Sequence, residues 1–465
     1  MENNILPDGW EWTTFGAVIE KMSNGTTATQ TKEQDGVPVS RIETISQGKI
    51  DLGRIGYIQN ASPDLINKYK LQKGDLLFSN INSDIHLGKT ALFELEGITL
   101  LHGMNLLLLR PNADTITPRF LHYLCNHYRS LGRFIAVAQH AVNQSSINQT
   151  KLKQITIPLP PIPEQERIVS RIEELFSDLE AGVAALERVR AGLKRYKASV
   201  LKAACEGKLV DQELNNEPAN LLLRRIDSQR RAQWEEQSRE VETKKKPKYQ
   251  EPQQIDNPKL YKLPTGWTWV TLDEIGQEGR PIIYGIIKPG PHIPDGVPYV
   301  RVTEMKDGFI DVSLLRKTSV ERVRKFSRAT LKAGDLLISK DGTIGRVAVV
   351  PPELEGGNIT QHVMRAPIHS FVNRNYIILA VQSPYCQGWL TGETRGVALQ
   401  GVNVEDFRRL PIPLPPLSEQ KQIVAEVERR LSVVGEVESA VDGGLVRAAR
   451  LRQSVLKSAF EGRLL

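Results

Sequence analysis

The feature that most constrains the fold is an internal repeat, because two copies of one pattern fix the architecture before any single element is assigned. The segment 6–12, LPDGWEW, returns 257 positions later as LPTGWTW. The proline-rich segment 157–169 returns 255 positions later with 9 of 13 residues identical. Further repeated blocks, each with its second copy, are 35–38 with 295–298, 74–77 with 334–337, and 199–207 with 454–462. One half-molecule has been duplicated, and the two copies have diverged unequally.

Each half begins with a region that predicts a globular α+β domain. In the first half, short apolar runs alternate with frequent Gly, Asn and Asp, which is typical of short strands and turns. One helix is indicated where Thr117 can cap the chain and Pro118 suits the first turn. Its apolar residues Phe120, Leu121, Leu124 and Tyr128 share one face.

Each domain is followed by a segment with the period of a long helix. The prolines at 158–163 remove amide donors and fix φ, so they end the first domain. Apolar residues at three-and-four spacing then predict helices of about 40 residues, roughly 60 Å long at 1.5 Å per residue. Ser418 is the expected N-cap of the second helix, and Gly207 and Gly462 fit the left-handed position after a helix end. Such a helix with one apolar seam needs a partner, and its duplicate is the natural one. The predicted packing residues are Ile168, Ile172, Leu175, Leu179, Leu186, Leu193, Ile423, Val427, Leu431, Val434, Val441 and Leu445.

The repeat predicts five segments. These are a first domain at 1–155, a helical region at 156–210, a charged and proline-rich linker at 211–257, a second domain at 258–410, and a second helical region at 411–465. Within the linker, 221–242 is expected to be helical, and the lysines at 244–248 are able to contact phosphate. A solvated connector is the favoured interpretation of this stretch.

The spacing of residues in the sequence supports no catalytic motif. Gly88-Lys89-Thr90 resembles the end of a phosphate-binding loop, but Ser83 stands where the first glycine is required. The eight histidines are scattered, and the three cysteines are far apart and never form CxxC, which argues against a metal or disulfide framework. A net charge of +7 is only a mild indication of a polyanionic partner. The apolar runs are too short to cross a bilayer and no secretion signal is evident, so a cytoplasmic binding protein is expected.

The combined pattern resembles one known family. The paired LPxGWxW segments, the paired IPLPPxxEQxxIV segments and the SVLKxAxEGxL helix ends are similar to the specificity subunit of type I restriction-modification enzymes. The resemblance covers essentially the whole chain. It implies that each domain is a target recognition domain for one half of a split DNA site, and that the two helices form an antiparallel coiled coil.

The resemblance also implies partners and cofactors. The helical regions would dock two methyltransferase subunits, and restriction subunits would join through the complex. This chain would be non-catalytic and bind no cofactor, whereas the partners would use S-adenosylmethionine, ATP and Mg. Independently of the resemblance, a rigid helix pair can act as a ruler, because double-stranded DNA presents the same groove face about every 34 Å. Unlike domains on such a frame would read an asymmetric bipartite site.

Candidate DNA-contacting residues follow the repeated GDLL motif, because base reading and phosphate contact need amide, hydroxyl and basic side chains on loops. A second group of candidates precedes the proline-rich segment of each half. His140, Ser145 and Gln400 belong to this group, in addition to the residues named next. The first-domain candidates are Ser79, Asn80, Asn82, Ser83, Lys89, Gln139, Asn143 and Gln144, and the second-domain candidates are Ser339, Lys340, Thr343, Arg346, Thr394 and Arg395. Trp10 and Trp267 recur unchanged and are assigned to packing.

Two other functions remain open at this point. A coiled-coil scaffold without DNA affinity explains the helices but not the divergence of the domains. A self-sufficient nuclease needs a metal site that the spacing does not supply. For the DNA-reading hypothesis, replacing Arg346 is expected to weaken recognition of one half-site and leave the other unchanged.

Overall fold

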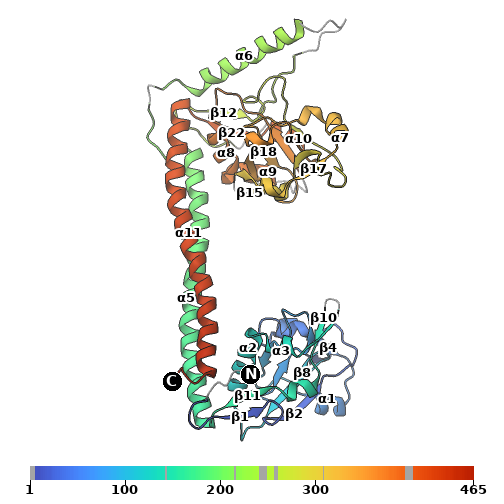
Figure 1. Ribbon diagram of the computed structural model, residues 1–465. Helices are drawn as coiled ribbons and strands as arrows, with labels where there is room; N and C mark the ends of the chain where they lie inside the picture. The colour runs from blue at the N-terminus through green and yellow to red at the C-terminus, as the bar shows by residue number, and fades with distance from the viewer. Residues whose placement is uncertain are drawn as a thin grey trace. The chain divides into compact units, whose positions relative to one another are not determined.

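The computed structural model describes residues 6–141, 144–213, 216–239, 249–255, 260–306, 308–392 and 402–465. The chain divides into two units, one of Met1–Arg188 with Val441–Leu465 and the other of Val189–Ala440. We call them unit 1 and unit 2, and their globular parts domain 1 (6–159) and domain 2 (260–414). The two longest helices, α5 (Ile162–Cys205) and α11 (Leu417–Phe460), each contribute to both units (Figure 1).

Domain 1 is built around an antiparallel sheet with the strand order β2-β8-β5-β7. Its last strand pairs with its first, which closes the domain next to the helix that follows. The strands are β1 (Glu11–Thr14), β2 (Ile19–Asn24), β3 (Val37–Val39), β4 (Gly56–Ile58), β5 (Leu76–Phe78), β6 (Ile81–Asn82), β7 (Thr90–Leu92), β8 (Leu107–Pro111), β9 (Gln139–Ala141), β10 (Gln144–Ser146) and β11 (Thr156–Leu159). The helices are η1 (Ile42–Ile45), η2 (Leu52–Arg54), α1 (Pro63–Tyr69), α2 (Pro118–Ser130), α3 (Arg133–Ala136) and α4 (Gln149–Lys153).

Domain 2 repeats this plan. Its sheet has the order β13-β21-β18-β19, and β12 pairs with β22 in the same register as β1 with β11. The strands are β12 (Thr268–Thr271), β13 (Ile283–Tyr284), β14 (Val297–Val300), β15 (Met305–Lys306), β16 (Phe309–Ile310), β17 (Arg316–Thr318), β18 (Leu336–Ser339), β19 (Val347–Val349), β20 (Asn358–Ile359), β21 (Val363–Ala366) and β22 (Pro411–Leu414). The helices are η3 (Val302–Glu304), η4 (Val312–Leu314), α7 (Val320–Lys325), η5 (Ser327–Ala329), η6 (Pro352–Leu354), α8 (Arg374–Gln382), α9 (Pro384–Thr391) and α10 (Val404–Arg408).

Within each unit, α5 and α11 lie side by side and run antiparallel. In unit 1, Glu180 pairs with Arg452 at 3.3 Å, while Leu186, further along α5, lies against Gly444, which is earlier on α11. In unit 2, Lys197 near the end of α5 pairs with Glu438 at 2.7 Å. Every residue predicted for the helix seam is buried or half-buried. The predicted α+β architecture with an antiparallel helix pair is therefore confirmed.

Each globular core is completed by the end of the other half's helix. The domain 1 core includes Ile168 and Ile172 from the start of α5, and Leu456 and Phe460 from the end of α11. The domain 2 core includes Ile423 and Val427 from the start of α11 together with the end of α5 around Val200 and Ala204. The first turns of each helix thus pack on their own domain as well as on the partner helix.

The glycine after each long helix fits the predicted left-handed position, with φ of 67° at Gly207 and 69° at Gly462. A Cβ at Gly207 would lie 2.3 Å from Cγ of Pro264, and a Cβ at Gly462 would lie 2.0 Å from Cγ of Pro7. These prolines belong to the two LPxGWxW segments. Each helix end therefore docks against the start of a domain, and only glycine fits there.

The repeated Trp and Glu-Gln pairs hold each domain onto its following helix. Trp10 donates to Glu164 at 3.0 Å, and Trp267 donates to Glu419 at 2.9 Å. Both tryptophans are 8% exposed, so their predicted packing role is confirmed. Gln165, which is fully buried, accepts from the Thr117 amide and donates to the Thr115 and Pro160 carbonyls, and Gln420 repeats two of these bonds in unit 2.

Replacing Gln165 with methionine should destabilise unit 1 by about 2–4 kcal/mol, because one buried and two part-buried backbone groups lose their partners while the volume stays similar. Gln154→Met, at an exposed position of domain 1, is the matched control and should change little. Hydrogen exchange across α2 measures the difference. Equal exchange rates in the two variants would show that the amide of Gln165 is dispensable.

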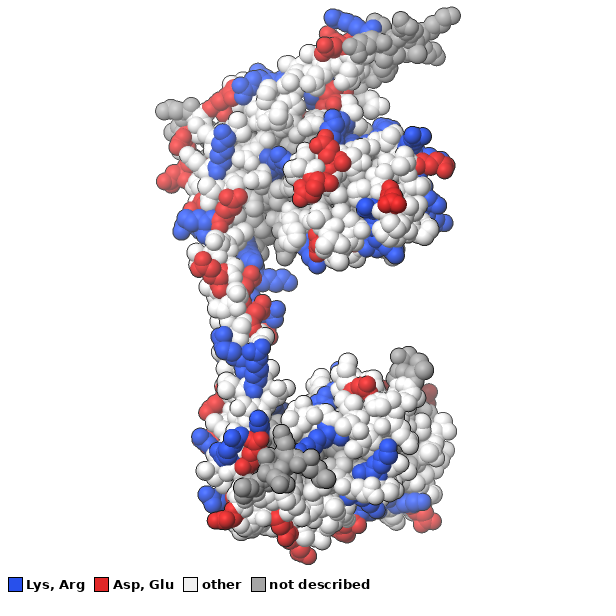
Figure 2. Space-filling view, viewed as in Figure 1, with Lys and Arg blue, Asp and Glu red and all other residues white. Residues whose placement is uncertain are grey.

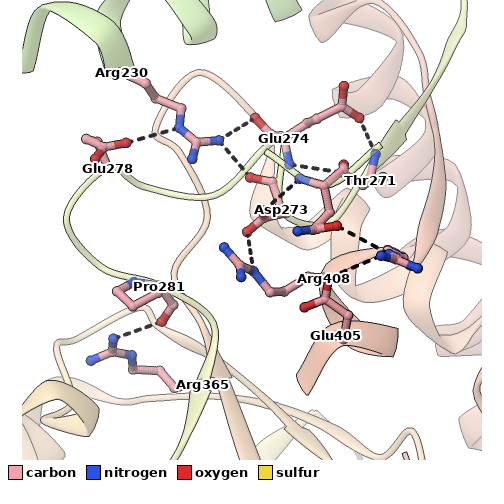
Figure 3. A network of polar contacts seen from close by, with 11 residues as sticks. Arg230, Thr271, Asp273, Glu274, Glu278, Pro281, Arg365, Glu405 and Arg408 are labelled. Carbon is pink, nitrogen blue, oxygen red and sulfur yellow. Dashed lines mark hydrogen bonds and ion pairs between the residues drawn. The ribbon is translucent and has the colours of Figure 1, made fainter. Parts of the chain in front are cut away.

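The segment expected as a linker, 211–257, carries a helix that packs on domain 2. Helix α6 (Ala219–Arg239) buries Ala219, Leu222 and Ile226 in the unit 2 core. Arg230, on the same face, donates to the Asp273 carbonyl at 2.8 Å and pairs with Glu278 at 3.4 Å (Figure 3). This stretch is thus only in part a connector, and the lysines at 244–248 lie outside the described residues.

Two boundaries differ from the sequence-based expectation. Helix α11 begins at Leu417, so Ser418 lies inside the first turn and is not the N-cap. The carbonyl of Pro416 already accepts from the amide of Gln420, and the preceding prolines fix the backbone for this early start. The two compact units also divide each long helix between them, whereas the repeat places each helix in one segment. The cause is that the end of α11 packs into the domain 1 core and the end of α5 packs into the domain 2 core, which we call the exchange of helix ends.

Candidate nucleic-acid interface

In domain 1, the two predicted groups of DNA-contacting residues lie next to each other. Strand β10 pairs with both β6 and β9, so Ser145 faces Asn82 on one side and His140 on the other. Gln139 and Gln144 are exposed, as is Ser83. Sequence reasoning treated these as separate groups, because nothing in the sequence shows that residues more than 50 positions apart pair as strands.

Other candidates in domain 1 hold this small sheet in place. Ser79 is 1% exposed and accepts from the Asn82 side chain at 3.1 Å. Asn80 is 7% exposed and donates to the carbonyl of Ile147 at 3.5 Å. Ser145 donates to Asp84, and the imidazole of His140 lies 2.8 Å from the Ser145 hydroxyl. These bonds fix the β6-β10-β9 surface, from which the exposed glutamines project.

In domain 2, the equivalent loop is shorter and has different chemistry. Thr343 is exposed, whereas Ser339 is fully buried and accepts from the amide of Arg346 at 2.9 Å. Lys340 pairs with Asp341 at 3.0 Å, and Asp341 also contacts His362 at 2.7 Å. Both surfaces therefore carry a carboxylate and an imidazole, Asp84 with His140 in domain 1 and Asp341 with His362 in domain 2. Domain 2 adds the cation of Lys340, whereas domain 1 adds the exposed amides of Gln139 and Gln144.

Lys89 and Arg346 occupy equivalent positions 257 residues apart, and both bind backbone carbonyls. Lys89 donates to the carbonyl of Ser46 at 2.5 Å, just after η1. Arg346 donates to the carbonyls of Val302 and Met305 at 3.2 Å and 2.8 Å, around η3. Both cations stabilise the same part of the fold by binding backbone carbonyls. Replacing Arg346 would therefore act on recognition indirectly, by loosening the loop next to it.

Several candidates cannot be placed. Asn143, Thr394, Arg395 and Gln400 lie outside the described residues. Sequence reasoning also missed Asp84, Asp341 and His362. The aspartates recur at the same offset of 257 as Lys89 and Arg346, so extending the repeat comparison through the loop would have found them. His362 has no counterpart in the repeat and gave no signal.

Over the described ranges, no group of three or more His, Cys, Asp or Glu side chains could hold a metal ion. No described helix is both long enough and apolar enough to span a lipid bilayer.

The arrangement defines a binding protein with two related but unlike loop surfaces on a duplicated frame. A family model described as the type I restriction modification DNA specificity domain matches residues 7–188 and 264–429, well over half of the chain. The chain therefore belongs to this family. It is a DNA specificity subunit of the type I restriction-modification kind, which recognises DNA sequence and is not itself an enzyme.

Individual relatives agree. A protein of Methanocaldococcus jannaschii named as the type I restriction enzyme MjaX specificity subunit is 44% identical, over 41% of this chain and 45% of that protein, less than half of its length. The Escherichia coli type I restriction enzyme EcoBI specificity subunit is 27% identical over 93% of this chain and 81% of its own. A solved structure described for complex assembly and conformational transition of the type I R-M system has a TM-score of 0.64 at 21% identity, covering 99% of both chains, which supports the fold.

Proposed function

We propose that domain 1 and domain 2 each read one half of an asymmetric bipartite DNA site through the loop surfaces described above. The observation that carries this is the contrast between frame and loops. The repeated residues, such as Trp10 and Trp267 with their glutamate partners, hold the frame. The exposed residues differ, with Gln139 and Gln144 in domain 1 and Thr343 in domain 2. Two domains that share a frame but differ in their exposed loop residues would recognise different half-sites.

The proposal extends to the helix pair and to partners. Antiparallel packing of α5 with α11 in each unit would let the pair set the spacer between half-sites, and the repeated helix sequences would offer two equivalent docking faces for two methyltransferase subunits. Restriction subunits would join through that complex. S-adenosylmethionine, ATP and Mg would be used by the partners, in the cytoplasm where the DNA is.

Replacing Gln144 with alanine should relax recognition in one half-site only. Gln144 is exposed on β10, and a bidentate amide contact to adenine is worth about 1–3 kcal/mol of discrimination. The measurement is a map of methylated adenines in cells that express the variant with its methyltransferase. Thr343→Ala should relax the other half and leave the first unchanged.

Gln154→Ala is the control, since this glutamine is exposed in domain 1 but lies outside the β6-β10-β9 sheet. It should leave the methylation pattern intact. If either loop variant lost recognition of both half-sites, this would contradict the proposal that each domain reads one half-site. A wild-type complex that shows no sequence preference in gel shifts would favour the scaffold function instead.

A further inference from the structure

Unit 1 contains a cavity of about 930 Å³ between domain 1 and the helix pair. Its walls come from the 46–49 turn, the start of β7, one side of α2 and both long helices, and its basic residues are Lys49, Lys89, Arg129 and Arg452. Figure 2 shows basic side chains on the visible face of unit 1, on the helices and on the adjoining part of domain 1.

The carboxylates of this cavity already have cationic partners. Glu180 pairs with Arg452 at 3.3 Å, and Glu173 pairs with Arg119 at 3.1 Å. Arg452 also lies over the ring of Phe176, 4.1 Å from its centroid. Among the residues that the structure describes, no carboxylate lies within ion-pairing distance of Lys89, Arg129 or Lys49. The cavity therefore keeps an excess of positive charge.

Arg129 and Lys89 are held toward the cavity by bonds that leave their charge uncompensated. Arg129 donates from Nη2 to the carbonyl of Ile85 at 2.7 Å, while its Nε is buried without a partner. Burial lowers the pKa of Arg129, and burial followed by repulsion from Arg129 lowers the pKa of Lys89. An anion bound between two such charges would offset both the repulsion and the cost of burial.

The location of the cavity indicates which kind of anion would reach it. Lys89 and Ile85 belong to the loop that directly follows β6, and β6 is part of the β6-β10-β9 surface proposed to read DNA. Bases are read next to backbone phosphates, which arginine and lysine bind as charged hydrogen-bond donors. We propose that this cavity binds a phosphodiester group of the DNA backbone beside the half-site read by domain 1, an inference that rests on the proposed function.

The test measures affinity and its salt dependence with the full chain bound to its methyltransferase. Each phosphate contact contributes about 0.9 to the slope of log K against log salt. Arg129→Gln and Lys49→Gln should each lower affinity about five- to tenfold at 0.1 M salt and reduce the slope by about one. The loss should be equal on cognate and unrelated DNA, since a phosphate contact carries no sequence information. Arg129→Lys should recover most of the affinity.

Lys49→Gln keeps the test valid if the Arg129 variant folds poorly, because Lys49 is exposed at the cavity wall. Lys21→Gln is the matched control, since Lys21 is exposed on β2, at the opposite edge of the sheet from β7. Unchanged affinity and slope in both cavity variants would overturn the phosphate site. A wild-type chain without sequence preference would instead remove the proposed function.

His86 supplies a second, independent readout. Its pKa is lowered by burial and then by the charges of Lys89 and Arg129, the cationic groups that face it. Bound phosphate would offset those charges, so the pKa of His86 should rise when a duplex binds, as measured by NMR of ¹³C-labelled histidine with His86→Gln to assign the signal. A rise with inorganic phosphate or AMP and none with DNA would contradict a backbone site.

Discussion

Replacing Asp335 with asparagine should destabilise unit 2 by about 3–5 kcal/mol, because it breaks a buried ion pair and leaves the arginines uncompensated. Asp335 is 3% exposed and accepts from Arg280 at 2.7 Å and 2.6 Å, as well as from the Lys332 amide at 2.8 Å. Arg365, 2% exposed, is close enough to be affected by both charges. Burial first and then repulsion from Arg280 lower its pKa to about 10, and Asp335 opposes this.

Hydrogen exchange resolved by mass spectrometry measures this effect unit by unit. Exchange in β18 and β21 should accelerate on the order of 10² to 10⁴-fold, while β5 and β8 stay unchanged. Asp75→Asn is the reciprocal variant, since Asp75 makes the equivalent bidentate pair with Arg110 at 2.7 Å and 2.8 Å. It should affect unit 1 alone. Similar protection of β18 in the wild type and Asp335→Asn would show that the pair contributes no net stability.

Replacing Gly207 with alanine should cost unit 2 about 2–5 kcal/mol through two separate effects. A left-handed backbone costs an L-residue roughly 1–2 kcal/mol, and forcing a methyl group into packed atoms costs about 1–3 kcal/mol more. The added Cβ would lie 2.3 Å from Cγ of Pro264, and a proline ring cannot rotate away. The end of α5 would have to leave domain 2, so exchange should accelerate in both β12 and the last turn of α5.

Gly132→Ala separates the two effects. Gly132 has a φ of 69°, close to the 67° of Gly207, but a Cβ there would meet nothing within 4 Å. It should therefore show the backbone cost alone, while Gly462→Ala should repeat the full loss in unit 1. Equal losses at Gly132 and Gly207 would mean that contact with the proline ring is unimportant.

Much of the fold could be predicted, because the sequence repeats most closely in the segments that join each domain to its long helix. The helix of Phe120 and Leu124, the long helices and the glycines that end them all follow from local periodicity and backbone chemistry. The exchange of helix ends could not be predicted, because the same apolar spacing in α5 serves both the partner helix and the domain. Helix α6 looked like a solvated linker because its many arginines mask a narrow apolar face.

The sequence shows which kinds of side chain follow the GDLL strands but not how these side chains are arranged. Hydroxyl and amide side chains after the GDLL strands were found from the sequence, yet Ser79, Asn80 and Ser339 turn out to be buried. Their hydrogen bonds hold the loops, whereas Gln139, Gln144 and Thr343 are exposed. Which polar residue points inward depends on strand pairing over long sequence separations, and local patterns carry no information about that.

The exchange of helix ends also has a consequence for synthesis on the ribosome. Phe460 packs against Phe120 and His127, with ring centroids 5.2 Å apart in both pairs. These rings lack the cover of Phe460 while the residues between 188 and 441 are translated, since Phe460 is synthesised after them. Unit 2, by contrast, consists of continuous sequence and can close earlier. Unit 1 is thus completed only after unit 2 has been synthesised.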